Sequence, residues 1–341
     1  MTTVVATVVV FGLLIFCHEL GHFLGAKGSG IKVHEFSLGF GPRLAGYRDR
    51  ETVYSLRALP LGGYTRMAGM DPGDTEPVEA GRSFNERPVW QRLVVIAAGP
   101  AANFLLAAVI LTVVFLVQGV PVVTNVVGSV LTGEPAQAAG VKPGDRIVAV
   151  DGHPVSDWDQ LVKEIQARPE RTIVLSVERG DSRLDIRVRT ATNASGQGLI
   201  GIVNADPQMV RRDPLVALSS GFVYTGRITG LILLFVGRMI FAHAPPEVGG
   251  PVRVAVEIGQ AAKVGLTNLA ELSAFLSINL GIFNLLPVPA LDGSRIVFLL
   301  TEAVRGRPVD PAKENFIHLV GLGLLLLLMV AITYNDILHL V

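Results

Sequence analysis

Two histidines and a glutamate interrupt an otherwise apolar segment near the start of the chain. In the stretch CHELGHFLGA, residues 17–26, His18 and His22 are four positions apart, so on a helix both side chains project from the same face. Neutral imidazole suits zinc, which takes three protein ligands and a water in hydrolytic sites. Glu19 lies on the same turn and is placed to take a proton from that water. The pattern predicts a hydrolytic zinc site within an apolar helix.

The third zinc ligand must come from elsewhere in the chain, and Asp292 in the segment NLLPVPALDG is the best candidate. Pro287 and Pro289 end the preceding helix, so a carboxylate can emerge there from irregular backbone that faces a cavity. The same Leu-Asp-Gly could equally form a tight turn without a ligand. Glu35 lies on the wrong side of a glycine-containing turn. The other histidines are expected to be surface or interfacial residues: His34, His153, His243, His318 and His339.

Composition indicates a membrane protein. Half of the 341 residues are hydrophobic and 17% are charged, whereas soluble domains average about 25% charged residues. A helix that crosses a bilayer needs roughly 20 mostly apolar residues, and four segments are long enough: about 3–26, 93–118, 269–288 and 316–338. The run at 231–242 is shorter and contains Arg238, so we expect an interfacial or re-entrant helix there.

Charge and cysteine content exclude two other classes of protein. Lys+Arg and Asp+Glu both total 29, so the chain has no global basic field, and a nucleic-acid partner is not expected. The single cysteine, Cys17, excludes an internal disulfide framework.

The basic residues that flank the expected spans predict the orientation of the chain. They place both termini outside and the loops 27–92 and 289–315 in the cytoplasm. The first and third spans then both end on the cytoplasmic side, so His18, His22 and Asp292 can meet at similar depth. The residues concerned are Lys27, Lys32, Arg82, Arg87, Arg92, Arg295, Arg305, Arg307 and Lys313.

Three regions separate or connect the spans. Residues 122–205 show short alternating strands, turn signals and one helix, and resemble a PDZ domain, which binds an extended peptide or a C-terminus; a spacer without a ligand is the alternative. Residues 206–267 form a linker to a second membrane part at 268–341. The glycine-rich loop at 31–70, within the first membrane part at 1–118, suggests β-hairpins, either an edge for an extended substrate or a simple connector.

Three motifs together resemble the site-2 protease family of intramembrane zinc metalloproteases. They are HELGH in the first span, Gly99-Pro100-Ala101-Ala102-Asn103 in the second, and the segment from Asn284 to Gly293 after the third. The PDZ-like insert makes the chain similar to the branch that includes the bacterial regulator of sigma-E protease. Only one PDZ-like domain is found, whereas familiar members of that branch carry two.

This resemblance implies a function and a set of site residues. His18, His22 and Asp292 would bind one Zn²⁺, Glu19 would be the catalytic base, and Asn284 and Asn103 would hold the substrate backbone. The implied substrate is a single-span protein already trimmed by another protease, such as a membrane-bound anti-sigma factor or a signal-peptide remnant. The implied fold is a polytopic α-helical protein of the bacterial inner membrane, with four transmembrane helices, an external PDZ-like domain and a cytoplasmic β-hairpin loop.

Two other functions compete with a protease. A catalytically inactive membrane scaffold could bind peptides through the PDZ-like domain, but it needs neither the HELGH nor the LDG motif. A zinc or proton transporter would also need histidines and carboxylates within the membrane. Glu19 beside the histidine pair and the prolines that end the third span favour hydrolysis.

Overall fold

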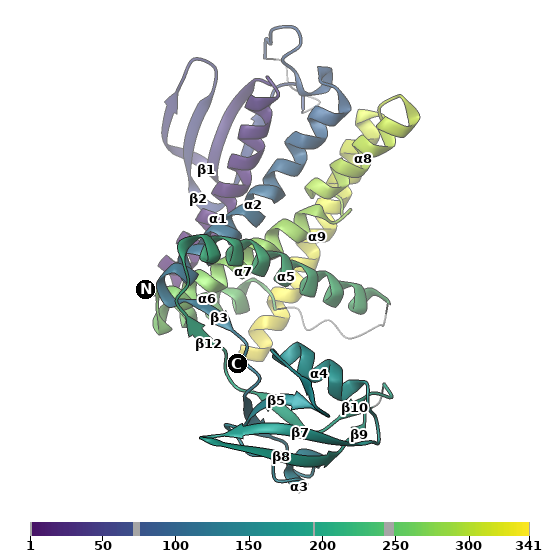
Figure 1. Cartoon of the computed structure of the whole chain (residues 1–341). Helices are drawn as coiled ribbons and strands as arrows, with labels where there is room; N and C mark the ends of the chain where they lie inside the picture. Colours follow the sequence, from purple (N-terminus) through teal and green to yellow (C-terminus); the bar gives the residue numbers. More distant parts are fainter. Residues whose placement is uncertain (1, 71–75, 194, 242–248, 341) are drawn as a thin grey trace. The chain divides into compact units, whose positions relative to one another are not determined.

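The computed structural model describes residues 2–70, 76–193, 195–241 and 249–340 (Figure 1). The chain forms two compact units: Met1–Val114 together with Pro214–Val341, here called the membrane unit, and Phe115–Asp213, here called the insert unit. The helices of the membrane unit are α1 (Thr2–Gly28), α2 (Val89–Gln118), α5 (Pro214–Phe241), α6 (Pro251–Val264), α7 (Leu266–Leu285), α8 (Asp292–Arg305) and α9 (Pro311–Leu340).

Five helices among the described residues are long and apolar enough to cross a bilayer, namely α1, α2, α5, α7 and α9. Four of them coincide with the expected spans. The interfacial helix expected at 231–242 is wrong in length, because α5 begins at Pro214 and runs to Phe241, while residue 242 lies outside the described residues. Hydroxyl-bearing residues and Arg227 lower the hydropathy of its first half. In Figure 1, α5 runs across the direction of α1 and α2.

Small residues bring α1 and α2 close together. A Cβ added at Gly21 would overlap the backbone of Ala98, and one added at Gly25 would lie 3.2 Å from the Cα of Val95. Close backbone approach at small residues is how helices associate in lipid, where apolar burial provides little driving force. The helix that carries both histidines of the HELGH motif is therefore held directly against α2.

The strands β1 (Val33–Arg48) and β2 (Val53–Met67) lie beside α1 and fold back on themselves (Figure 1). Phe36 in the first half of β1 pairs with Tyr54 on one side and with Thr65 on the other, while Arg48 pairs with Val53. The halves therefore form four antiparallel segments in the order 43–48, 53–57, 35–38, 63–67. The segment 63–67 pairs with a strand on one side only, among the residues that the structure describes.

A buried ion pair connects α2 to α8. Arg92 forms a bidentate pair with Glu302, in which Nη1 lies 3.0 Å from Oε2, and both side chains are largely buried. Fork-on-fork pairs of this kind fix orientation as well as distance. The pair ties the C-terminal half of α8, the helix that begins at Asp292, to the start of α2.

The insert unit has a conventional soluble core. Its four-stranded antiparallel sheet has the order β6-β5-β7-β8, and α4 packs its Leu161 and Ile165 into the core beside Ile147 and Leu175. The elements are β3 (Val120–Val122), β4 (Val127–Val130), α3 (Pro135–Ala138), β5 (Arg146–Val150), β6 (His153–Pro154), α4 (Trp158–Gln166), β7 (Thr172–Arg179), β8 (Ser182–Arg189), β9 (Ala191–Thr192), β10 (Gly198–Leu199), β11 (Ile202–Asn204) and β12 (Gln208–Val210).

Candidate active site

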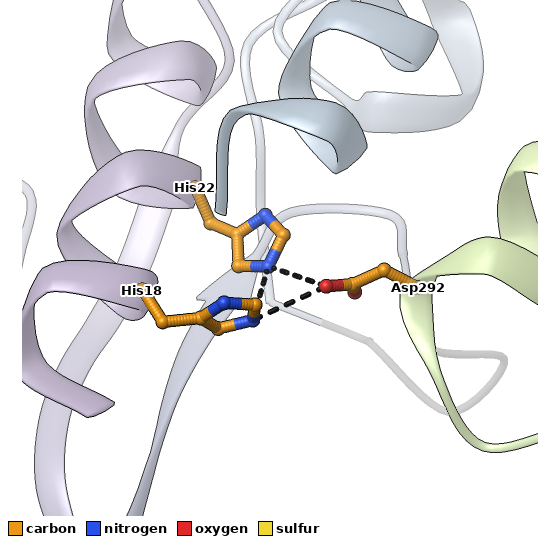
Figure 2. A group of neighbouring side chains, drawn as sticks. All are labelled: His18, His22 and Asp292. Atoms are coloured by element: carbon orange, nitrogen blue, oxygen red, sulfur yellow. Dashed lines mark hydrogen bonds and ion pairs between the residues drawn. The ribbon is translucent and has the colours of Figure 1, made fainter. Parts of the chain in front are cut away.

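Three side chains from two distant parts of the sequence converge in the membrane unit (Figure 2). Asp292 Oδ2 lies 3.1 Å from His18 Nε2 and 3.3 Å from His22 Nε2, and the two Nε2 atoms are 3.2 Å apart. His18 and His22 are buried, with 9% and 7% of their surface exposed. His18 and His22 come from α1, whereas Asp292 is the first residue of α8.

His22 is held by α2 on the side away from Asp292. Its Nδ1 lies 3.0 Å from the carbonyl oxygen of Val95. Since a carbonyl only accepts hydrogen bonds, Nδ1 carries the proton and the Nε2 lone pair is free to bind a cation. A Cβ at Gly99 would overlap the His22 ring. The glycine of the motif in the second span therefore makes room for this imidazole.

His18 has its own partner on α2. The side-chain amide of Asn103 lies 3.3 Å from His18 Nδ1, and Asn103 is fully buried. The hydroxyl of Ser277 on α7 donates to the Asn103 carbonyl oxygen at 2.8 Å, which ties α7 to α2 at this level. Each imidazole thus has a contact behind it that holds the ring with Nε2 toward Asp292. At His22 the Val95 carbonyl accepts from Nδ1, as the outer contacts of metal-binding histidines do.

Glu19 is positioned by the edge segment of β2. Thr65 Oγ1 donates a hydrogen bond to Glu19 Oε2 at 2.8 Å and lies 3.1 Å from the Glu19 carbonyl oxygen. A Cβ at Gly63 would lie 3.1 Å from Glu19 Cγ and 2.8 Å from the Ser37 carbonyl oxygen. Gly63 therefore allows the strand to approach α1 closely enough for Thr65 to reach the carboxylate.

A polar cavity of about 380 Å³ opens beside these groups. Asn284 on α7 and the strand residues Tyr64 and Thr65 line it together with His18, Glu19, His22 and Asp292. Asn103 is not among the described residues that line the cavity; it lies behind His18 instead. The structure therefore brings Asn284 to the cavity and places Asn103 against an imidazole.

The other residues considered as ligands lie elsewhere. His34 is buried beside Glu76, with His34 Nδ1 3.0 Å from Glu76 Oε2. Glu35 is bound by Ser55 and Arg57. His153 belongs to β6 of the insert unit, and His318 contacts the backbone of Ala290. His243 lies outside the described residues.

The three converging atoms fit a zinc ion. Zinc–ligand distances of about 2.0–2.2 Å in a tetrahedron separate the ligand atoms by roughly 3.3–3.5 Å, close to the 3.1–3.3 Å found here. Asp292 Oδ2 is buried and forms no hydrogen bond of regular geometry within the described residues. Burial tends to raise the pKa of Asp292, but the two imidazoles hold it well below its usual range, so the carboxylate is ionised as a ligand must be.

The residues that sequence reasoning missed are those of the supporting contacts. Thr65 stands in the segment LGGYTRM, where the two glycines signal a close approach but not its partner. The contact from the Val95 carbonyl cannot be predicted from residue type, because every residue has a backbone carbonyl.

Comparison with known proteins identifies the family. The model of peptidase family M50 matches residues 6–328, which is nearly the whole chain. The chain belongs to peptidase family M50. It is a zinc metalloprotease of the site-2 protease type and an integral membrane protein, and its cofactor is Zn²⁺.

Two relatives support this assignment over their full length. The zinc metalloprotease RasP of Geobacillus kaustophilus is 35% identical, with 99% of this chain and 98% of the relative covered. The regulator of sigma-W protease RasP of Bacillus subtilis is 33% identical, with the same coverage of each.

Two solved structures match part of this M50 peptidase. The PDZ domain of an SdrC-like protein from Listeria monocytogenes matches 26% of this chain and 87% of its own length, at 24% identity and a TM-score of 0.22. The second domain of a Listeria protein matches at 26% identity, also with a TM-score of 0.22. Scores of this size do not establish a shared fold.

Proposed function

We propose that His18, His22 and Asp292 bind the zinc ion of this peptidase and that Glu19 is its catalytic base. The observation that carries the proposal is the convergence of three ligand atoms within 3.3 Å, with Glu19 on the same helix turn and facing the same cavity. Bound zinc supplies a Lewis acid that activates water and polarises the scissile carbonyl.

The chain's own residues move the proton. Glu19 takes a proton from the attacking water and delivers it to the amide nitrogen of the leaving group, as a general acid–base pair requires. Thr65 holds the carboxylate by donating to Oε2, which leaves Oε1 free to face the water. The two imidazoles are held in place by Val95 and Asn103.

The substrate binds as an extended strand. A transmembrane helix keeps its carbonyls in internal hydrogen bonds, so it must unwind before hydrolysis. The segment 63–67 offers one free edge beside the cavity, and an unwound chain can pair with it by strand addition. Asn284, on the cavity wall, can bind a substrate amide. These contacts favour hydrolysis within or near the transmembrane segment.

The chain crosses the bilayer four times, with both termini and the insert unit outside. Asp292 follows α7 and contacts His18 near the end of α1, so α1 and α7 end on the same, cytoplasmic side. An even number of crossings must then separate α2 from α7. With 14 residues, α6 is about 21 Å long and does not span a hydrocarbon core of about 30 Å. We therefore assign α5 to the membrane interface.

The substrate is a single-span membrane protein that another protease has already shortened, an anti-sigma factor or a signal-peptide remnant. The name of the Bacillus subtilis relative, regulator of sigma-W protease, supports the first of these. The insert unit, as a PDZ-like domain on the outer side, would exclude substrates with large external domains or bind the newly made terminus.

Purified peptidase and a fluorescent single-span substrate test the proposal. We expect zinc-dependent cleavage in the wild type and a loss of about 100- to 10,000-fold in Glu19→Gln, the range for removing a general base. The matched control is Glu271→Gln, the same substitution on α7 at a residue that does not line the cavity.

Two outcomes contradict the assignment. Cleavage by Glu19→Gln at the wild-type rate would show that another group is the base. Zinc transport into liposomes without cleavage would favour a transporter. The inactive variant also allows bound, trimmed substrate to be captured and identified by mass spectrometry.

A further inference from the structure

The turn that presents Asp292 has an unusual backbone. It joins α7 to α8 and contains two prolines, and Ala290 within it has a φ of +72°, a conformation that side chains other than glycine rarely adopt. Inside the turn, the Leu291 N–H donates to the carbonyl oxygen of Val288 at 3.1 Å. The Ala290 N–H points out of the turn and needs a partner elsewhere.

That partner is His318 on α9. The Ala290 N–H donates to His318 Nδ1 at 3.0 Å. A backbone N–H can only donate, so Nδ1 must be the unprotonated nitrogen and the proton must lie on Nε2. The ring also packs edge-on against Phe298 of α8, with centroids 5.7 Å apart. One imidazole therefore contacts both the turn and the helix that follows it.

Gly321 makes a second contact between α9 and the same turn. It lies three residues after His318, on the same face of α9. A Cβ at Gly321 would overlap the side chain of Pro289 and approach its carbonyl carbon to 3.0 Å. Gly323, two residues further along, has no atom within 4 Å of the corresponding position. Only the first of these two glycines is required by the turn.

The far end of α9 is also fixed. Asp336 accepts hydrogen bonds from the backbone N–H groups of Gly250 and Arg253, both at 3.0 Å, and so caps the start of α6. The rest of α9 is largely exposed on the surface of the unit. This helix therefore contacts the membrane unit mainly at its two ends, one of which is the turn before Asp292.

We propose that His318 and Gly321 form a latch that sets the position of Asp292. His318 acts as a hydrogen-bond acceptor that stabilises the strained Ala290 conformation, and Gly321 lets Pro289 seat against α9. Both are positioning residues, which contact neither substrate nor metal. The inference rests on the proposed role of Asp292 as a zinc ligand. The latch gives His318 a function that its residue type alone does not indicate, since a histidine there suggests only a metal ligand or an interfacial residue.

Variants that keep or remove the acceptor test the latch in the full-length protein. His318→Leu removes it, whereas His318→Asn places an amide oxygen near the position of Nδ1. We expect zinc affinity, measured by competition with a chelator, to fall about 10-fold or more in the Leu variant, the effect typical of lost outer contacts. The Asn variant should stay within about 3-fold of the wild type, since it can still accept the bond.

Gly321→Ala tests the second contact without touching the imidazole. We expect it to weaken zinc binding in the same direction as His318→Leu, while Gly323→Ala, the matched control on the same helix, leaves binding unchanged. The visible spectrum of the cobalt-substituted protein reports ligand geometry directly, and it should change in Gly321→Ala and His318→Leu only. Circular dichroism of the metal-free proteins checks that each variant is folded.

The outcomes separate the latch from the site on which it depends. If Asp292→Asn loses zinc while folded His318→Leu binds it as tightly as the wild type, the latch is refuted and the ligand assignment stands. If Asp292→Asn retains wild-type zinc affinity, the ligand assignment itself is refuted. Equal impairment of the Asn and Leu variants at position 318 would show that the hydrogen bond to Ala290 does not position Asp292.

Discussion

Two aspartates with largely buried carboxylates, Asp145 in the insert unit and Asp292 in the membrane unit, differ in how their charge is compensated. Asp145 in the insert unit is fully buried and accepts hydrogen bonds from Arg179 Nε at 2.7 Å, Arg179 Nη2 at 2.8 Å and the Lys142 N–H at 2.8 Å. Asp292 in the membrane unit has two imidazole nitrogens near Oδ2 and no hydrogen bond of regular geometry to that oxygen within the described residues.

The difference is the one expected between a structural carboxylate and the proposed zinc ligand. A buried charge is tolerated when its hydrogen-bond capacity is filled, as at Asp145. At Asp292 the nearest groups are the two imidazole nitrogens that we propose as zinc ligands, so Oδ2 has no regular hydrogen bond within the described residues. Burial and a lowered pKa are common to Asp145 and Asp292 and do not distinguish them. The stronger sign of function is that several possible ligand atoms meet at Asp292 without a regular hydrogen bond to its Oδ2 in the part of the chain that the structure describes.

The same substitution in both aspartates gives the largest expected contrast. Asp292→Asn should lose bound zinc and reduce cleavage to the background rate, because a neutral amide replaces an anionic ligand. Zinc content by mass spectrometry and the cleavage assay measure this. Retention of the metal in Asp292→Asn would break the comparison, since Asp292 would then be structural too.

Asp145→Asn should instead affect stability. We expect the insert unit to lose about 3 kcal/mol of unfolding free energy, the lower end of the range for breaking a buried ion pair, because Arg179 is partly exposed. Hydrogen exchange of β5 and β7 measures it in the full-length chain. Zinc content serves as the control and should not change.

A smaller effect is expected from the contact that orients Glu19. Thr65→Val removes the hydrogen bond to Oε2 and keeps the shape of the side chain, so kcat should fall about 10-fold, which corresponds to about 1.4 kcal/mol. The matched control is Thr112→Val, whose hydroxyl bonds within its own helix to the Ala108 carbonyl. Equal rates for both variants would show that Thr65 does not position the base.

The smallest effect is a dependence of insert-unit stability on pH. Burial tends to raise the pKa of Asp145, but the hydrogen bonds from Arg179 and Lys142 lower it below its usual value. A depressed folded-state pKa contributes stability above the unfolded-state value of about 3.9 and loses it as the pH falls. The protection factors of the β7 amides, which correct for the pH dependence of intrinsic exchange, should therefore fall below about pH 4 in the wild type and depend less on pH in Asp145→Asn.

Sequence patterns predicted which helices and strands this protein forms better than they predicted the residues at which these elements begin and end. The short alternating strands predicted within residues 122–205 include β5 and β7, and in β7 the buried Ile173, Leu175 and Val177 alternate with more exposed neighbours. The helix α5 was underestimated because its polar first half lacks a hydropathy signal, although Pro214 marks its start.

The sequence by itself determined the chemistry of this peptidase. The spacing of His18 and His22, the glutamate between them and the prolines before Asp292 follow from residue types and helix geometry alone. Tertiary structure decided which groups stand behind them: the Val95 carbonyl, Thr65 on a strand edge, and His318 on the last helix. These contacts join backbone atoms and side chains far apart in the chain, and such pairs have no fixed spacing for a pattern to detect.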